Sequence, residues 1–217
     1  MFGFTKTEVA LFRALNSPTK IQNFLNKIPS NFEPRGETCL SPRLVLQQRR
    51  AHCLEGALLA ATILRFHGYP PLVLDLTANE QDKDHVIAVF RRFDHWGAIS
   101  KTNHATLRYR EPVYRTLREL VMSFFHEYFL DKNGRKTLRS YSHPVDLRRF
   151  DHTGWMTDKD SVWYINDYLF EVKHYSLLSK AQLASLRPAD MIERKIGKLK
   201  EWDKSTVLPH QKLYPPK

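Results

Sequence analysis

Two side chains in the first half of the chain have the chemistry of a thiol nucleophile and its base. Cys53 stands at the start of a long apolar segment, HCLEGALLAATILRFHG, and His85 opens the segment HVIAVFRR. A cysteine attacks a carbonyl as its thiolate, and a neutral histidine within hydrogen-bond reach takes the thiol proton and returns it to a leaving group. The pair therefore indicates nucleophilic catalysis. The alternative is that Cys53 is a small buried apolar residue.

The environment expected for Cys53 favours its thiolate. The apolar residues that follow it have the spacing of a buried helix, which Gly68 ends and Pro70 prevents from continuing. A helix N-terminus carries partial positive charge, and this charge lowers the pKa of a cysteine placed there. Glu55, in the first turn, suits the helix dipole but opposes the thiolate if it faces the sulfur. Gly56 either lets another segment approach closely or is only a weak helix residue.

A third polar residue is needed to orient His85. The segments HVIAVFRR and WGAISKT have the composition of two antiparallel strands joined by a turn at FDH. If that turn is centred on Asp94, position 85 faces Asn103, whose side-chain carbonyl can accept the imidazole N–H. A register slipped by one residue makes Thr102 the neighbour, and Ser100 is a further candidate. The predicted catalytic residues are Cys53, His85 and Asn103, with Ser100 as the alternative orienting residue.

The order of these residues resembles that of a known superfamily. A cysteine on a helix that ends in G-x-P, then a strand, then a histidine on the next strand, resembles the transglutaminase-like superfamily of the papain-like cysteine peptidase fold. Within it, the pattern is similar to the bacterial transglutaminase-like cysteine peptidases. The resemblance covers residues 39–105 and rests on HCLEGALLAATILRFHGYPPLVL, DHVIAVF and WGAISKT. It implies a cysteine helix packed on a small antiparallel sheet.

The sequence departs from the family pattern at one position. Where the family usually reads W-x-x-x-D-P-T, its aspartate falls on Ser100, which carries no charge. The resemblance therefore implies that Asn103 or Ser100 takes over the orienting role, or that the site is a Cys–His dyad. The backbone amide of Cys53 is one candidate donor to an oxyanion, and Gln47 or Gln48 is a second if its loop folds back.

The other segments predict an α+β fold. Ser17-Pro18 and Ser41-Pro42 each precede a short helical pattern, because serine caps a helix and proline suits its first position. The N-terminal residues are spaced like an amphipathic helix, and EPVYRTLRELVMSFFHEYF predicts another one over residues 111–129. Strands are expected at LVLDL, HVIAVFRR and WGAISKT.

A change in composition near residue 132 suggests how the chain is organised. Residues 1–131 are expected to form the transglutaminase-like core with its N-terminal helices. Residues 132–217 are expected to form a mostly helical C-terminal extension or subdomain, with helices at SVWYINDYLFEV and ADMIERKIGKLKEW. The Pro-rich tail TVLPHQKLYPPK is expected to be irregular.

Composition limits the classes of function. The 217 residues carry a net charge of +11, with Lys and Arg spread in short clusters from Arg43 to Lys200. A solvated basic surface has the same composition, so the charge does not require a nucleic-acid partner. The N-terminus lacks a signal-peptide pattern, and no apolar run reaches the roughly 18–20 residues that cross a bilayer. We therefore expect a cytoplasmic protein in which Cys39 and Cys53 stay reduced.

These observations lead to two hypotheses. In the first, the chain is a cysteine hydrolase or acyltransferase that acts on an amide, isopeptide or thioester bond of a protein or peptide-like substrate. In the second, it is an inactive module of the same fold that binds a protein or an anionic partner. The spacing of its histidines and cysteines and the absence of a glycine-rich phosphate loop predict no metal and no cofactor.

Overall fold

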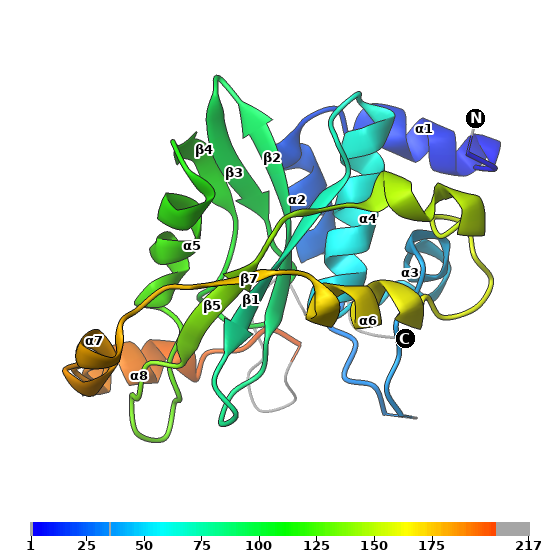
Figure 1. Ribbon diagram of the computed structural model, residues 1–217. Helices are drawn as coiled ribbons and strands as arrows, with labels where there is room; N and C mark the ends of the chain where they lie inside the picture. Colours follow the sequence, from blue (N-terminus) through cyan, green and yellow to red (C-terminus); the bar gives the residue numbers. More distant parts are fainter. Residues whose placement is uncertain (1, 35, 203–217) are drawn as a thin grey trace.

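The chain forms an antiparallel sheet with helices on both faces (Figure 1). The computed structural model describes residues 2–34 and 36–202. Within them the sheet has seven strands in the order β4-β3-β2-β1-β5-β7, and β6 pairs with β1. This arrangement confirms the predicted α+β class. The strands are β1 (Leu72–Ala78), β2 (His85–Arg92), β3 (His95–Ile99), β4 (Arg110–Tyr114), β5 (Leu138–Ser142), β6 (Val145–Asp146) and β7 (His174–Ser176).

The sheet separates two hydrophobic cores. The larger core lies between one face and the helices α1 (Lys6–Ala14), α2 (Pro18–Asn26), α3 (Pro42–Gln48), α4 (Cys53–Phe66) and α6 (Trp163–Glu171), with the 3-10 helix η1 (Leu147–Thr153). The smaller core lies between the other face and α5 (Leu117–Phe125). Figure 1 shows α5 on the left of the sheet and α4 on the right. Alternate residues of β1 and β2 enter opposite cores, as the two-residue period of a strand requires.

The two predicted serine caps form at the starts of α2 and α3. Ser17 Oγ accepts the backbone N–H of Lys20, and Ser41 Oγ accepts that of Leu44. In each helix the proline that follows the cap is the first helical residue. These two helices pack against α4, whose sequence is buried along most of its length.

The turn between β2 and β3 sets a register different from the predicted one. Phe93 and Asp94 both have positive φ, of 53° and 59°, which gives a two-residue turn flanked by the pair Arg92 and His95. The turn is therefore centred between residues 93 and 94, one half-residue before the predicted centre. Position 85 consequently lines up with position 102 and not with Asn103, so the predicted pairing is wrong.

The segment after β3 also differs from its prediction. The first residues of EPVYRTLRELVMSFFHEYF form β4 at the edge of the sheet, and the helix begins only at Leu117. Pro112 is tolerated in β4 because an edge strand has one side without ladder hydrogen bonds. Thr116 caps α5 by accepting the N–H of Glu119. The helix predicted over residues 111–129 therefore forms only over residues 117–125.

Residues beyond 132 build part of the sheet that holds the first strands. β5 and β6 both pair with β1, and β7 pairs with β5. The helices α6, α7 (Lys180–Ala184) and α8 (Met191–Gly197) belong to the same segment. The boundary expected near residue 132 thus falls inside the connection from α5 to β5, within one continuous sheet. The predicted irregular tail, residues 206–217, lies outside the described residues.

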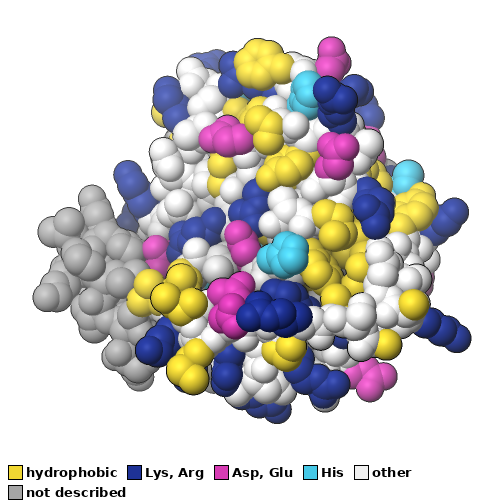
Figure 2. Space-filling view, turned by 90° about the vertical axis from the view of Figure 1, so that its left-hand side faces the viewer, with side chains coloured by type: hydrophobic (Ala, Val, Ile, Leu, Met, Phe, Trp, Pro, Cys, Tyr) yellow, Lys and Arg dark blue, Asp and Glu magenta, His cyan; other side chains and the backbone are white. Residues whose placement is uncertain are grey.

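Charge is dispersed over one face of the molecule. On the face seen in Figure 2, Lys and Arg side chains lie among acidic and apolar ones. In the described part of the chain, no helix is both long enough and apolar enough to cross a bilayer.

Candidate active site

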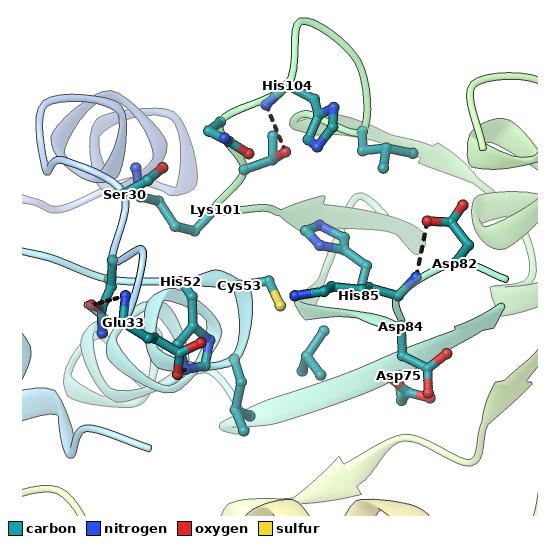
Figure 3. A pocket seen from close by; sticks show the side chains of 18 of the residues that line it. Ser30, Glu33, His52, Cys53, Asp75, Asp82, Asp84, His85, Lys101 and His104 are labelled. Atoms are coloured by element: carbon teal, nitrogen blue, oxygen red, sulfur yellow. Dashed lines mark hydrogen bonds and ion pairs between the residues drawn. The ribbon is translucent and has the colours of Figure 1, made fainter. Parts of the chain in front are cut away.

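A pocket of about 790 Å³ opens beside the first turn of α4. It collects residues from the loop before α3, from the start of β2, from the segment after β3, and from α6. Cys53, His52 and His85 all line it, and Figure 3 shows the sulfur of Cys53 between the His52 side and the His85 side. Cys53 and His85, the predicted nucleophile and base, thus line the same pocket.

Cys53 is the first residue of α4 and is half-buried. Its backbone N–H lies in the first turn, where an α-helix offers no acceptor of its own and the dipole is positive. Burial raises the pKa of the thiol, but hydrogen bonds from His52 and His85 lower it, and the net pKa lies well below the usual value. Cys39 has the opposite environment, since burial raises its pKa to about 12. Both cysteines are free.

His85 is held by the segment that follows β3. Its Nε2 lies 2.8 Å from Ser100 Oγ, and Ser100 Oγ donates its own proton to the carbonyl of Leu107 at 2.5 Å. Because that hydroxyl has one proton, it must accept from His85, so Nε2 carries the hydrogen. Nδ1 of His85 then carries the lone pair of the ring. The ring is 6% exposed, which fixes this arrangement inside the protein.

Ser100, and not Asn103, is the residue hydrogen-bonded to the His85 ring. Asn103 lines the same pocket, and its backbone carbonyl accepts the N–H of Glu201. The prediction of Asn103 as the orienting residue depended on the hairpin register, which is shifted by one residue, and β3 ends at Ile99. Ser100 was the alternative, and its backbone is held in place by Gln22, whose Oε1 accepts the Ser100 N–H at 2.9 Å.

A second imidazole, His52, was missed by the sequence analysis. Its Nε2 lies 2.9 Å from the carbonyl oxygen of Thr38 and 3.3 Å from Glu55 Oε1. Burial works against its protonation, but the hydrogen bond with Cys53 and the charges of Cys53 and Glu55 outweigh it and raise its pKa to about 9. The signal in the sequence was simple: His52 directly precedes the cysteine and stands three residues before a glutamate.

Glu55 anchors the loop that covers this side of the site. The carboxylate is fully buried and accepts the backbone N–H groups of His52 and Leu40 at 2.9 and 3.0 Å. It also accepts from Thr38 Oγ1 at 2.7 Å and from Asn31 Nδ2 at 3.1 Å. A carboxylate surrounded by donors is stable in a buried position because its lone pairs are satisfied. Glu55 therefore does more than complement the helix dipole.

A glycine lets the end of the sheet reach α4. A Cβ added at Gly56 would lie 2.3 Å from Lys101 Cβ, a distance that no packed structure tolerates. This close approach confirms the first of the two interpretations of Gly56 and brings Ser100 and Lys101 to the first turn. Lys101 is 2% exposed and its Nζ donates to the carbonyl of Ile28 at 2.6 Å; burial lowers its pKa to about 8.

Carboxylates lie on the His85 side of the sulfur, as Figure 3 shows for Asp75, Asp82 and Asp84. Burial raises the pKa of Asp75 to about 6, and burial likewise raises the pKa of Asp84. Asp84 Oδ1 accepts the N–H of Ala78, and Asp82 Oδ2 accepts the hydroxyl of Thr137. This side of the pocket is thus acidic in a chain whose net charge is +11.

Aromatic side chains form another part of the pocket wall. Phe32, Trp163 and Phe170 line it and are 57%, 38% and 63% exposed. Gln47 and Gln48, the conditional oxyanion donors of the sequence analysis, are exposed and are not among the lining residues. The Cys53 amide remains as the candidate donor. Among the described residues, no group of three or more His, Cys, Asp or Glu side chains is arranged to hold a metal ion.

The chain was also compared with known proteins. No protein-family model matches it, and a search of curated proteins finds no match.

Proposed function

We propose that this protein is a cysteine-dependent hydrolase or acyltransferase that acts on an amide, isopeptide or thioester carbonyl. One observation carries the proposal: Cys53, at a helix N-terminus, lines one pocket with His52 and His85, the two imidazoles lower the pKa of its thiol, and Ser100 holds the His85 ring in one tautomer. A thiol, a base and a residue that orients the base are the parts of a nucleophilic cysteine site.

Acylation begins with attack of the Cys53 thiolate on the substrate carbonyl. The Sγ–C bond forms, and the carbonyl oxygen develops negative charge near the Cys53 backbone amide, whose N–H and helix dipole favour an anion. The C–N, or in a thioester the C–S, bond of the substrate then breaks. The leaving group takes a proton from an imidazolium beside the sulfur, and the acyl group stays on Cys53.

Deacylation needs a base for the incoming acceptor. Water or an amine attacks the thioester and gives a proton to His85, whose Nδ1 is the lone-pair nitrogen in the tautomer set by Ser100. The acceptor bonds to the carbonyl carbon, and Cys53 leaves as a thiolate. Water yields hydrolysis and an amine yields transfer.

A protein or peptide-like substrate suits the pocket. Its volume of about 790 Å³ is within the range of sites that enclose several residues or a drug-sized ligand. The wall combines exposed aromatic side chains with buried polar groups, a composition suited to binding an apolar side chain next to a polar scissile bond.

A transglutaminase-like fold is part of the proposal. Its support is the order of elements: the cysteine on the first turn of α4, the histidine at the start of β2, and Ser100 at the place where the family pattern has an aspartate. The inactive-module hypothesis gains its support from that missing charge. The lowered pKa of the Cys53 thiol, in one pocket with His85, favours catalysis over it, because a binding module has no need of an activated thiol.

The two cysteines provide the test. Incubation with iodoacetamide near neutral pH, followed by peptide mass spectrometry, is expected to label Cys53 far faster than Cys39, which is buried with a raised pKa. Cys53→Ala is expected to abolish amidase or thioesterase activity on a peptide substrate library, and Cys39→Ala to retain it. Equal labelling of both cysteines, together with activity that survives Cys53→Ala, would disprove the proposal.

A further inference from the structure

We propose that Glu127 is a positioning residue that sets the tautomer of the His85 imidazole. It acts through the left-handed backbone of Leu107, which in turn fixes the hydroxyl of Ser100. The inference rests on the proposed function, because it explains how the base of that site is held. Its support is a continuous chain of hydrogen bonds that runs from the carboxylate after α5 to the imidazole at the start of β2.

The backbone of Ser100 is held from the side of α2. Ser100 comes directly after β3, whose ladder with β2 ends at Ile99. There the carboxamide of Gln22 takes the place of a neighbouring strand: its Oε1 accepts the Ser100 N–H and its Nε2 donates to the Ser100 carbonyl, both at 2.9 Å. Nε2 gives its other hydrogen to Asn26 Oδ1 at 2.8 Å, so the buried amide is fully used. The Ser100 backbone is therefore fixed, and its hydroxyl alone can still rotate.

The hydroxyl of Ser100 can meet the imidazole of His85 in two ways. It can accept a hydrogen from Nε2, or it can donate its own hydrogen to a bare Nε2, and these two arrangements belong to the two neutral tautomers. The carbonyl of Leu107 decides between them, because it lies 2.5 Å from Ser100 Oγ and can only accept. While that carbonyl is in place, Nε2 of His85 carries the hydrogen.

Leu107 presents this carbonyl from an unfavourable backbone conformation. Its φ is +60°, in the left-handed region that a residue with a Cβ enters only at an energetic cost. Such a conformation persists where the surrounding contacts over-determine it. The N–H of Leu107 donates to Glu127 Oε2 at 2.8 Å, so the carboxylate holds one end of the residue whose other end holds Ser100. Without the carboxylate we expect Leu107 to relax and its carbonyl to leave the hydroxyl.

Arg110 of β4 anchors the carboxylate of Glu127. Its Nη2 donates to the same oxygen, Oε2, at 2.6 Å and to the carbonyl of Ser123 at 3.1 Å. Its Nε donates to Ser123 Oγ at 2.9 Å, and its guanidinium carbon lies 4.1 Å from the centre of the Phe124 ring. The guanidinium thus fastens Glu127 to the last turn of α5, and a charge-assisted bond of this kind is stronger than a neutral one.

The tautomer of His85 provides the test. Nitrogen-15 NMR at about pH 8.5, where an ordinary imidazole is neutral, distinguishes Nε2–H from Nδ1–H, and His85→Gln identifies the signal. The wild type should show Nε2–H alone. In Glu127→Ala the Ser100 hydroxyl is free to donate, so the Nδ1–H form should appear. Loss of an acetyl group placed on Cys53 by p-nitrophenyl acetate should slow about tenfold in this variant, because its base is no longer fixed.

Two matched variants separate positioning from a general loss of stability. Oε2 of Glu127 accepts from both Leu107 and Arg110, so the single carbonyl oxygen of Glu127→Gln can take over both bonds. This variant should keep the Nε2–H tautomer and deacylate within about twofold of the wild-type rate. Glu119→Ala removes a carboxylate at the other end of α5, where it accepts the Arg115 N–H at 2.7 Å. It should also leave the tautomer unchanged.

Four results would overturn the assignment. They are a wild-type His85 with its hydrogen on Nδ1, an unchanged tautomer in Glu127→Ala, and a shift in Glu127→Gln or in Glu119→Ala as large as that in Glu127→Ala. If Glu127→Ala fails to fold, Glu127→Met, which keeps the length of the side chain without a strong acceptor, takes its place. The wild-type tautomer can contradict the proposal without any variant.

This proposal and the proposed function fail in different ways. If the tautomers behave as expected but no acyl group is ever found on Cys53, the positioning role stands and the proposed catalysis is wrong. If Cys53 is acylated and deacylated equally fast in the wild type and in Glu127→Ala, with the same tautomer in both, catalysis stands and the role of Glu127 is wrong.

Discussion

His52 and His85 lie on opposite sides of one sulfur, and different kinds of structure hold them. His52 caps α4 and is tied through Glu55 to the loop of residues 31–40, by hydrogen bonds to a buried carboxylate. His85 begins a strand of the sheet and is tied to Ser100 by a chain of neutral groups. The His52 side, here called the charged side, therefore rests on one buried carboxylate, whereas the His85 side, here called the neutral side, rests on the position of Ser100 just after β3.

The largest expected effect concerns the charged side. Glu55→Gln replaces a carboxylate oxygen by an NH₂ group that would face donors from Asn31, Thr38, Leu40 and His52. We expect a loss of about 3–5 kcal/mol in the free energy of unfolding, as when one partner of a buried charged network is removed. Urea denaturation measures it, with the surface variant Glu80→Gln as control. A loss below about 1 kcal/mol would show that Glu55 does not anchor this side.

The next largest effect is expected at Gly56, where the first turn of α4 touches Lys101 in the segment after β3. In Gly56→Ala the new Cβ meets Lys101 Cβ, so α4 and the end of the sheet must move apart. We expect a cost of about 1–3 kcal/mol, despite the better helix propensity of alanine. A double-mutant cycle with Lys101→Gly, which removes the opposing Cβ, should recover part of that cost. If the losses of stability caused by Gly56→Ala and Lys101→Gly simply add, the contact between these residues does not determine the distance between α4 and the segment after β3.

The neutral side should show a smaller effect on stability and a clear one on catalysis. Ser100→Ala removes the acceptor of His85 Nε2–H and the donor to Leu107. We expect about 1–2 kcal/mol of lost stability from the unpaired groups, and turnover reduced about tenfold to a hundredfold because His85 is no longer fixed. Asn103→Ala is the matched control in the same pocket. Equal losses from both variants would restore Asn103 as a candidate for the orienting role.

The smallest expected effect is the pH dependence due to Asp75. Its pKa rises from 3.8 in the unfolded chain to about 6 in the folded one, mainly through burial. The folded state therefore binds the proton more tightly, so this contribution to stability is complete below pH 3.8 and is lost as the pH rises through 6. Asp75→Asn should be more stable than the wild type by about 1–2 kcal/mol above pH 6, with the difference vanishing toward pH 4. A constant difference at all pH values would contradict this explanation.

The sequence was sufficient for those parts that local patterns determine. The apolar spacing after Cys53 and the strand composition of HVIAVFRR predicted α4 and β2 with their functional residues at the ends. Ser17 and Ser41 predicted two helix starts, because a cap is a local interaction. The cysteine–histidine pair followed from these elements.

The features that could not be predicted from the sequence depend on contacts between segments far apart in the chain. The turn shifted the register by one residue and so removed Asn103 from the position opposite His85. Ser100 reaches His85 from just beyond the end of β3, where Gln22 and Leu107 hold it. The role of His52 depends on residues 31–40 folding over Glu55, which no local pattern encodes. β5, β6 and β7 are two to five residues long, too short for a period to be recognised. Their places are set by pairing with distant strands, β5 and β6 with β1 and β7 with β5.

The central claim is that Cys53 forms an acyl-enzyme and that His85 assists its breakdown. The most direct measurement is intact-protein and peptide mass spectrometry after brief exposure to an activated ester such as p-nitrophenyl acetate at pH 6.5. We predict one acetyl group on Cys53 in the wild type and in Cys39→Ala, slow loss of that group in His85→Gln, and no acetyl group in Cys53→Ala. Acetylation spread over surface lysines, unchanged by Cys53→Ala, would contradict the account.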